Sequence, residues 1–196
     1  MGREKATLSI ESKQLVGWAC EAASGFANHV YISIHDRSGE GRLRPVLPLG
    51  TVCLLDLYDG PRSVILALLS SFRQMREEHI AVLPVDSPFM SPNVMLKMIS
   101  SCMEYDSVIP LWPDGKLEAI HAVYNRRTTL PVLEDLWKDR TLEVWQIAKK
   151  SGKTLFMSTE TLAELDPSLL SLLDADTPEE FESLRTAKFI NRRTHS

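Results

Sequence analysis

Two kinds of apolar segment follow one another along this chain. Short apolar runs predict strands that are covered on both faces, and segments with apolar residues every three or four positions predict helices. The predicted strands are residues 29–35, 51–57, 80–85, 107–111, 119–124 and 154–157. Their alternation with helices indicates an α/β fold of Rossmann-like type, with a mostly parallel sheet and helices on both faces. The last strand but one, residues 119–124, is expected to return antiparallel.

Turn and capping residues set the expected bounds of the helices. Ser12 is placed to cap a helix that stops at Gly25. Residues 37–50 hold three glycines and two prolines, which predicts a loop. A terminal helix is expected to begin at Pro178, capped by Asp176 or the residue after it. Further helices are predicted over residues 62–76, 92–103, 126–138 and 141–151.

The strand at residues 80–85 leads straight into Asp86, and Ser87-Pro88 cannot continue the strand. The predicted strand contains one misfit, Pro84, which a central strand should avoid. Open α/β sheets bind their ligands at the carboxyl ends of the strands, so Asp86 is placed to face a ligand. The alternative is that Asp86 caps the following helix or starts a turn, and the residues of this stretch alone leave both open.

Composition narrows the classes of function. The 196 residues suit a single domain, residues 1–196, and a hydrophobic content of 44% with 24% charged residues indicates a globular protein. The formal charge of −4 argues against a nucleic-acid-binding protein. No apolar run is long enough to predict a membrane span. The cysteines are predicted to be small buried residues in a reducing cytoplasm: Cys20, Cys53 and Cys102.

Acidic residues recur where predicted strands end. Asp56 follows the second strand, Asp86 follows the third, and Asp174 or Asp176 stands near a late one. Several carboxylates on one sheet edge suggest a site for a divalent metal and a phosphate, because Mg²⁺ prefers oxygen ligands. The alternative is that each acid caps its neighbouring helix, which is the favoured interpretation for Asp176.

Motif-like segments extend along nearly the whole chain. Residues 1–8 (MGREKATL) look like the end of a glycine-rich loop closing in Arg-Met-Gly-x-x-Lys, and residues 30–35 like a strand that normally ends in asparagine. Residues 54–61 look like an acid followed by Gly-Pro, and residues 82–89 like a metal-binding strand with Asp-x-Pro-Phe. Two further segments follow along the chain. Residues 117–124 (LEAIHAVY) are similar to Glu-Pro-Leu…Tyr, and residues 174–179 (DADTPE) are similar to Asn-x-Asn-Thr-Pro-Glu.

In order and spacing these segments resemble the molybdenum cofactor guanylyltransferases, a family of nucleotidyltransferases with the nucleotide-diphospho-sugar transferase type of fold. The resemblance implies transfer of GMP from GTP to molybdopterin with release of pyrophosphate, using Mg²⁺ as cofactor. It also implies contacts with other cofactor-biosynthesis proteins or with acceptor molybdoenzymes. A cytidylyltransferase acting on molybdopterin or another phosphate acceptor is the nearest alternative.

The resemblance also assigns roles to residues. Asp86 would bind Mg²⁺ against the phosphates, and Lys5 would place a positive charge on them; both are candidate catalytic residues. His35 and Asp56 would contact the nucleotide together with Lys5 and Asp86. Without the resemblance, Lys5 would be interpreted as a solvated lysine and His35 as a surface or packing residue.

Two departures from the family pattern bear on activity. The family's first strand and its Leu-Ala-Gly-Gly turn have no counterpart here, and Arg62-Ser63-Val64 replaces the Leu-x-Gly that usually follows Gly-Pro. Loss of a central strand would leave backbone groups unpaired on both neighbouring strands. Either the true start lies upstream of Met1, or the chain is a degenerate, non-catalytic copy that binds a partner or cofactor. We expect the first.

Overall fold

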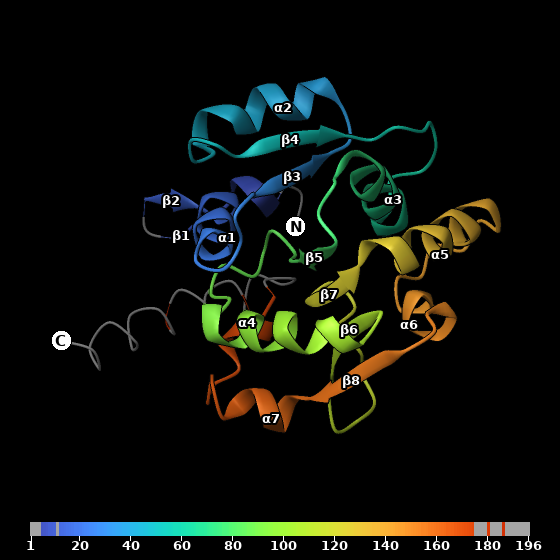
Figure 1. Ribbon diagram of the computed structural model, residues 1–196. Helices are drawn as coiled ribbons and strands as arrows, with labels where there is room; N and C mark the ends of the chain where they lie inside the picture. Colours follow the sequence, from blue (N-terminus) through green and yellow to red (C-terminus); the bar gives the residue numbers. More distant parts are fainter. Residues whose placement is uncertain (1–4, 11, 175–179, 181–185, 187–196) are drawn as a thin grey trace.

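The strands form three separate sheets in the computed structural model, which describes residues 5–10, 12–174, 180 and 186 (Figure 1). A four-stranded sheet has the order β5–β7–β6–β8, and β3 pairs with β4 alone. A small antiparallel hairpin is made of β1 and β2. The strand bounds are β1 Ser9–Ile10, β2 Lys13–Gln14, β3 Tyr31–Ile34, β4 Val52–Leu55, β5 His79–Val82, β6 Ser107–Leu111, β7 Ala122–Asn125 and β8 Thr154–Ser158.

The helices lie between these strands in the chain. The α-helices are α1 Leu15–Ser24, α2 Arg37–Leu43, α3 Val64–Gln74, α4 Pro92–Ser101, α5 Arg126–Lys138, α6 Gln146–Lys150 and α7 Thr159–Ala163. Short 3₁₀ helices are η1 Lys5–Thr7, η2 Arg44–Val46, η3 Cys102–Glu104 and η4 Leu170–Leu172. The mixed α/β architecture agrees with the fold class predicted from the sequence.

Both faces of the four-stranded sheet are covered by helices. Alternate residues of β7 show this: Tyr124 packs against α3 and α5 in one core cluster, and Val123 packs against α4 in another. The same alternation holds in β6, where Ile109 faces the first cluster and Val108 the second. Successive strand residues point to opposite faces, so two covered faces require the uninterrupted apolar runs seen in the sequence.

Strand directions match the prediction in detail. β3 runs parallel to β4, and β6 runs parallel to β8. β7 is antiparallel to both β5 and β6, as expected for residues 119–124. The turn before β7 is closed by Trp112 and Lys116 and uses Gly115 at a φ of 90°, a left-handed conformation that favours glycine.

Several predicted bounds are wrong for local reasons. Ser12 does not cap α1, because residues around it form the β1–β2 hairpin and the cap position is Gln14; the helix does end at Gly25. Residues 37–50, predicted as a loop, contain α2 and η2. Asp36 caps α2 by accepting a hydrogen bond from the Gly39 amide at 2.9 Å. That cap stabilises a helix despite its glycines.

β5 ends at Val82, earlier than predicted. Pro84 therefore lies outside the strand and removes no ladder hydrogen bond, which explains the misfit within the apolar run. Asp86 follows in a turn rather than directly at the strand tip.

Other sequence expectations have mixed outcomes. Cys20 and Cys102 are buried as predicted, and burial raises the pKa of each thiol to about 11, whereas Cys53 is only half-buried. The predicted terminal helix from Pro178 lies outside the described residues. In the part of the chain that the structure describes, no helix has both the length and the apolar character needed to cross a membrane.

Candidate active site at the carboxyl ends of the strands

His35 and Asp56 meet at the carboxyl ends of two parallel strands. Ile34 pairs with Leu55 in the β3–β4 register, so the next residue of each strand lies at the same edge. His35 Nδ1 lies 2.8 Å from Asp56 Oδ2, and the Asp56 side chain is only 8% exposed. The other carboxylate oxygen, Oδ1, is buried and has no hydrogen-bond partner among the described residues. It is therefore an acceptor available to a donor from a ligand.

Asp86 lies in a second polar group, built from the turn after β5, the segment before β7 and the segment after η4. Asp86 is buried, with 7% of its surface exposed. The neighbouring Ser87 hydroxyl lies 2.7 Å from His121 Nε2 and donates to Asp174 Oδ1 at 2.5 Å. His121 is fully buried, and its Nδ1 has no hydrogen-bond partner in the described structure. Residues far apart in sequence are thus joined around one turn.

Glu118 anchors this polar group on the opposite side of His121. Its Oε1 accepts from Trp112 Nε1 and from Lys116 Nζ, both at 2.7 Å, and its Oε2 lies 3.6 Å from His121 Nδ1. Burial alone would raise the pKa of the Glu118 carboxyl, but these polar neighbours outweigh burial and lower the pKa to about 2. Glu118 is therefore a fixed negative charge at neutral pH.

Asp174 has the opposite electrostatic character. Burial raises the pKa of its carboxyl, and the nearby charges of Asp86 and Glu118 raise it further, although His121 and Ser87 oppose them. Carboxylates that repel one another in a partly buried site are stabilised when a cation binds between them. The ligand atoms of Glu118, His121 and Asp174 also lie within 4.8 Å of one another. Oxygen donors of this kind suit Mg²⁺ or a similar divalent cation.

One cavity of about 390 Å³ extends from His35 to Val85, the residue just before Asp86. It is lined by His35 and the rest of β3, by Leu83 and Val85 just before Asp86, and by Ala6 next to Lys5. Arg42 and Arg62 line it as well, together with Asp36, whose Oδ2 lies 3.2 Å from Arg62 Nη2. Such a mixture suits a bound anion held together with a cation.

A family model for the MobA-like NTP transferase domain matches residues 1–154, which is most of the chain. The chain belongs to this family. The MobA-like assignment confirms the resemblance found in the sequence and places the protein among nucleotidyltransferases.

Individual relatives agree with the MobA-like family. A probable molybdenum cofactor guanylyltransferase of Methanosarcina mazei is 29% identical over 188 residues, which cover 92% of this chain and 82% of that protein. A protein of the same name from Methanosarcina acetivorans is 26% identical over 189 residues, with the same two coverages. The crystal structure of molybdopterin-guanine dinucleotide biosynthesis protein A from Archaeoglobus fulgidus has a TM-score of 0.82 at 20% identity, covering 95% of this chain and 91% of that one.

The structure brings some predicted site residues of this MobA-like protein together and adds others. His35 and Asp56 are in contact, and Val85, the residue before Asp86, lines the same cavity as His35. Lys5 is placed in η1, next to the cavity-lining Ala6, but its side chain lies outside the described atoms.

Sequence reasoning missed Glu118 and His121, and left Asp174 without a role. The signal for the first two was present in residues 117–124, where a histidine stands three positions after the acid inside an apolar run. No local pattern links Asp174 to Ser87, because 87 positions separate them and only the fold joins them.

Proposed function

We propose that this protein transfers GMP from GTP to molybdopterin, releasing pyrophosphate and forming a guanine dinucleotide cofactor. The observation that carries the proposal is the match to guanylyltransferases along nearly the whole chain, with 92% of it covered. A polar site at the carboxyl ends of the strands supports it, since α/β sheets bind nucleotides there.

In this proposal the nucleotide lies in the cavity between the two polar groups. His35 and Asp56 hold one end of GTP, where the buried Oδ1 of Asp56 accepts a hydrogen bond from the ligand. Lys5 and the arginines that line the cavity, Arg42 and Arg62, attract the triphosphate by charge. The reaction joins two anions, so neutralisation and alignment of the phosphates account for most of the catalysis.

Asp86 and Asp174 are the proposed ligands of Mg²⁺. The cation would supply Lewis-acid polarisation of the reacting phosphate and neutralise charge on the pyrophosphate that leaves. Ser87 and His121 keep the Asp174 carboxylate in place through the 2.5 Å and 3.4 Å contacts at its Oδ1. Glu118 in turn holds a negative charge next to His121. These contacts fix the acid pair before substrate arrives, which avoids reorganisation during the reaction.

The test is release of pyrophosphate and formation of the dinucleotide when purified protein is mixed with molybdopterin, Mg²⁺ and each nucleoside triphosphate in turn. GTP should be the only nucleotide that reacts well. A preference for CTP would replace the proposal with a cytidylyltransferase. No product with any nucleotide would support a non-catalytic binding module.

Asp86→Asn should reduce turnover by on the order of a thousandfold, because the amide carries no charge for the cation. Asp139→Asn is the matched control, since Asp139 lies at the exposed end of α5 and pairs with Lys150 far from the cavity. Equal activity of the two variants would remove Asp86 from the proposed site.

A further inference from the structure

The segment between α7 and Asp174 is folded around one buried acid, Asp166. The side chain of Asp166 accepts two hydrogen bonds at its Oδ2, from the backbone N–H and from the hydroxyl of Ser171, both at 2.7 Å. Asp166 is 9% exposed and Ser171 is 1% exposed, so water competes little for these bonds. Hydrogen bonds to a carboxylate are stronger than those to a neutral oxygen. Asp166 therefore holds Ser171 in one position.

The turn between these two residues has an unfavourable backbone conformation. Leu169 has a φ of 49°, in the left-handed region that residues other than glycine rarely adopt. Its N–H donates to the Asp166 carbonyl at 2.8 Å, and its own carbonyl accepts from the Leu172 N–H at 2.9 Å. A strained residue persists only where the surrounding structure fixes it. The hydrogen bonds from Ser171 to Asp166 close this turn and help to fix it.

Ser171 also joins the segment to the turn that carries Asp86. The Ser171 hydroxyl oxygen accepts a hydrogen bond from the Ser91 backbone N–H at 2.9 Å, just before α4 begins at Pro92. The hydroxyl hydrogen is directed to Asp166, which leaves the lone pairs of the oxygen for Ser91. Asp166, Ser171 and Ser91 thus form a chain of hydrogen bonds between two segments that are far apart in sequence.

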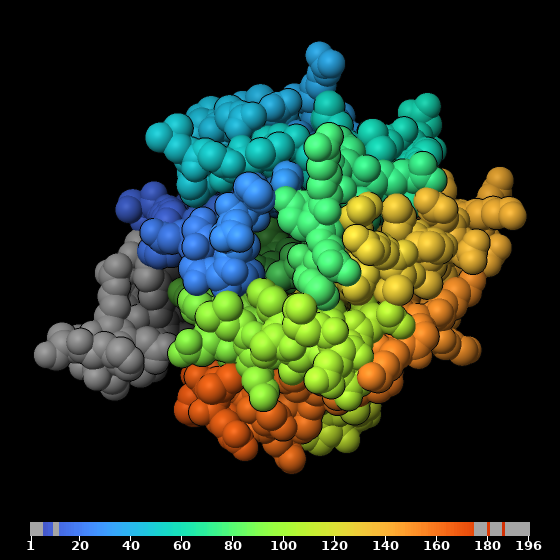
Figure 2. Space-filling model, viewed as in Figure 1, coloured from blue at the N-terminus to red at the C-terminus, as the bar shows by residue number. Residues whose placement is uncertain are grey.

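Apolar contacts hold the same two segments together. Leu172 and Met90 are both buried, and they belong to one core cluster with Val94 of α4 and Leu162 of α7. Figure 2 shows the orange-red atoms that include α7 packed beside the green atoms of α4. Apolar contacts are non-directional, so they do not by themselves set the register of one segment against the other. The hydrogen bonds of Ser171 set that register.

The register decides how Asp174 meets the turn that contains Asp86. Asp174 stands three residues after Ser171, and Ser91 stands five residues after Asp86. At the other end of the two segments, the Ser87 hydroxyl donates to Asp174 Oδ1 at 2.5 Å. The segments are thus joined at both ends, by Ser171 with Ser91 and by Asp174 with Ser87. Because few residues separate the two contacts, a shift at the first pair would move the second.

We propose that Asp166 is a positioning residue of the candidate active site, which acts through Ser171 to set the separation of Asp86 and Asp174. The inference rests on the proposed function, in which these two acids bind Mg²⁺. Mg²⁺ demands nearly ideal geometry from its ligands. Residues that orient metal ligands therefore affect metal affinity without touching the cation.

The test measures the binding of Mn²⁺, a cation that also prefers carboxylates, from the paramagnetic resonance signal of the free ion without nucleotide. Asp166→Ala should weaken Mn²⁺ binding on the order of tenfold. Ser171→Ala removes a single hydroxyl and should also weaken binding. Asp166→Asn keeps an acceptor oxygen and should weaken it less than Asp166→Ala does. The affinity for GTP without metal should not change in any of these variants, because His35 and Asp56 follow other strands.

Asp106→Ala is the matched control. The Asp106 carboxylate also accepts from a backbone N–H, that of Lys153 at 2.7 Å. Asp106 precedes β6, and β6 runs parallel to β5 because both are antiparallel to β7, so it lies at the edge of the sheet opposite to Asp86. Both alanine variants should lose stability in urea, but only Asp166→Ala should lose Mn²⁺ affinity. Without metal, hydrogen exchange at the Ser91 amide should be faster in Asp166→Ala and unchanged in Asp106→Ala.

Equal Mn²⁺ affinity of the wild type, Asp166→Ala and Ser171→Ala would overturn the inference and leave the proposed function standing. A loss of the same size in Asp106→Ala would also overturn it, because general stability would then govern metal affinity. If Asp166→Ala does not fold, Ser171→Ala and Asp166→Asn decide the outcome in the same titration. Asp86→Asn tests the metal site itself. Unchanged binding in that variant, or no binding by the wild type, would overturn the proposed metal site and this inference with it.

Discussion

The four-stranded sheet and the β3–β4 pair differ in how their polar residues are held. In the four-stranded part, helices cover both faces, and Ile109, Val123 and Tyr124 are fully buried. In the β3–β4 pair, Ile32 is only half-buried and lines a cavity between β3, β5 and α1. Glu118 and His121 belong to the covered part, whereas His35 and Asp56 belong to the open one. Tight packing fixes the positions of Glu118 and His121, whereas the register between β3 and β4 fixes those of His35 and Asp56.

The difference suggests a division of roles within the candidate site. The acids proposed to bind Mg²⁺ need rigid placement because a cation tolerates little error in its ligands, and Asp86 is buried. The pair proposed to contact the nucleotide, His35 and Asp56, follows β3 and β4, which pair only with each other within the described residues.

The largest effect on the free energy of unfolding is expected when one isoleucine from each part is replaced by alanine. Ile109→Ala should lower the free energy of unfolding by about 2–5 kcal/mol, since it leaves a cavity in a fully packed core. Ile32→Ala should cost less than about 1 kcal/mol, because its side chain already borders a cavity. Urea denaturation of both variants gives the two values. Similar losses would mean that the surroundings of Ile32 are packed as tightly as the covered sheet.

The second prediction concerns acid stability in the covered part. The pKa of Glu118 is lowered to about 2 in the folded protein, from about 4.3 for an unperturbed glutamate. The unfolded state therefore binds more protons in acid, and the stabilisation is present above about pH 4.3 and lost as pH falls towards 2. It amounts to at most about 3 kcal/mol.

Glu118→Gln should remove that part of the pH dependence when urea midpoints are measured with a chelator from pH 7 to pH 3. Glu164→Gln is the control, because Glu164 is exposed on the segment after α7. If the difference between wild type and Glu118→Gln stays constant with pH, the carboxylate is not held by its neighbours as the distances indicate.

Most of the elements of the fold could be predicted from periodicity and turn residues. α4 and α5 begin near their predicted residues, and β6 has the predicted bounds, because apolar runs and prolines are local signals. α2 was missed because its glycines suggested a loop. The hydrogen bond that Asp36 accepts from the Gly39 amide caps this helix and stabilises it. The separation of β3 from β5 has no signal in either strand, because pairing depends on a partner elsewhere in the chain.

Prediction of the candidate site from sequence has the same limit, because contacts between distant segments leave no local signal. Asp56 and Asp86 could be named as candidates because strand ends can be recognised from sequence. The contact of His35 with Asp56 follows from the register between β3 and β4, which sequence alone does not supply. His121 gave no clear signal, since a buried histidine inside an apolar run resembles an ordinary core residue until its neighbours are known.

The third prediction tests whether His35 and Asp56 act as one unit in the open part. Each of His35→Ala and Asp56→Asn should weaken GTP binding roughly tenfold, about 1.4 kcal/mol, because each removes or misorients the same ligand contact. The double variant should be no weaker than the more damaged single one. Calorimetry with GTP and Mg²⁺ gives the constants, and Asp59→Asn in the exposed turn after β4 serves as control. Additive losses would show two independent contacts.

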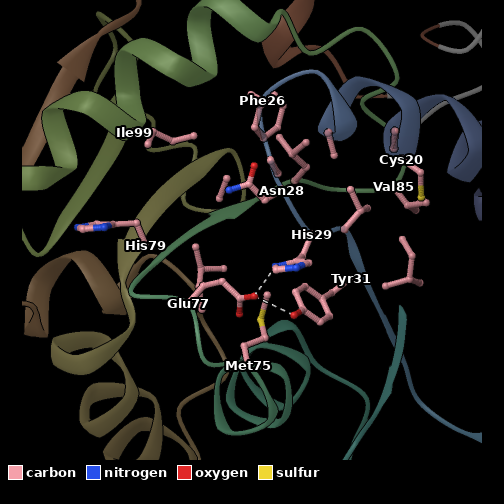
Figure 3. A pocket seen from close by; sticks show the side chains of 18 residues that line it. Cys20, Phe26, Asn28, His29, Tyr31, Met75, Glu77, His79, Val85 and Ile99 are labelled. Carbon is pink, nitrogen blue, oxygen red and sulfur yellow. Dashed lines mark hydrogen bonds and ion pairs between the residues drawn. The ribbon is translucent and has the colours of Figure 1, made fainter. Parts of the chain in front are cut away.

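The smallest effect tests the contacts of Tyr31 and His29 with Glu77, which join β3 to the segment that leads into β5 (Figure 3). Tyr31→Phe removes the hydroxyl that donates to Glu77 and should lower the free energy of unfolding by about 1 kcal/mol. Burial and the Glu77 carboxylate raise the pKa of Tyr31, so its contribution is present below about pH 10 and lost as pH rises beyond that. Tyr58→Phe is the matched control, because its ring packs near Arg73 and not near Glu77. If both variants lose equal stability at neutral pH, the hydrogen bond from Tyr31 to Glu77 does not contribute to holding β3 and β5 in place.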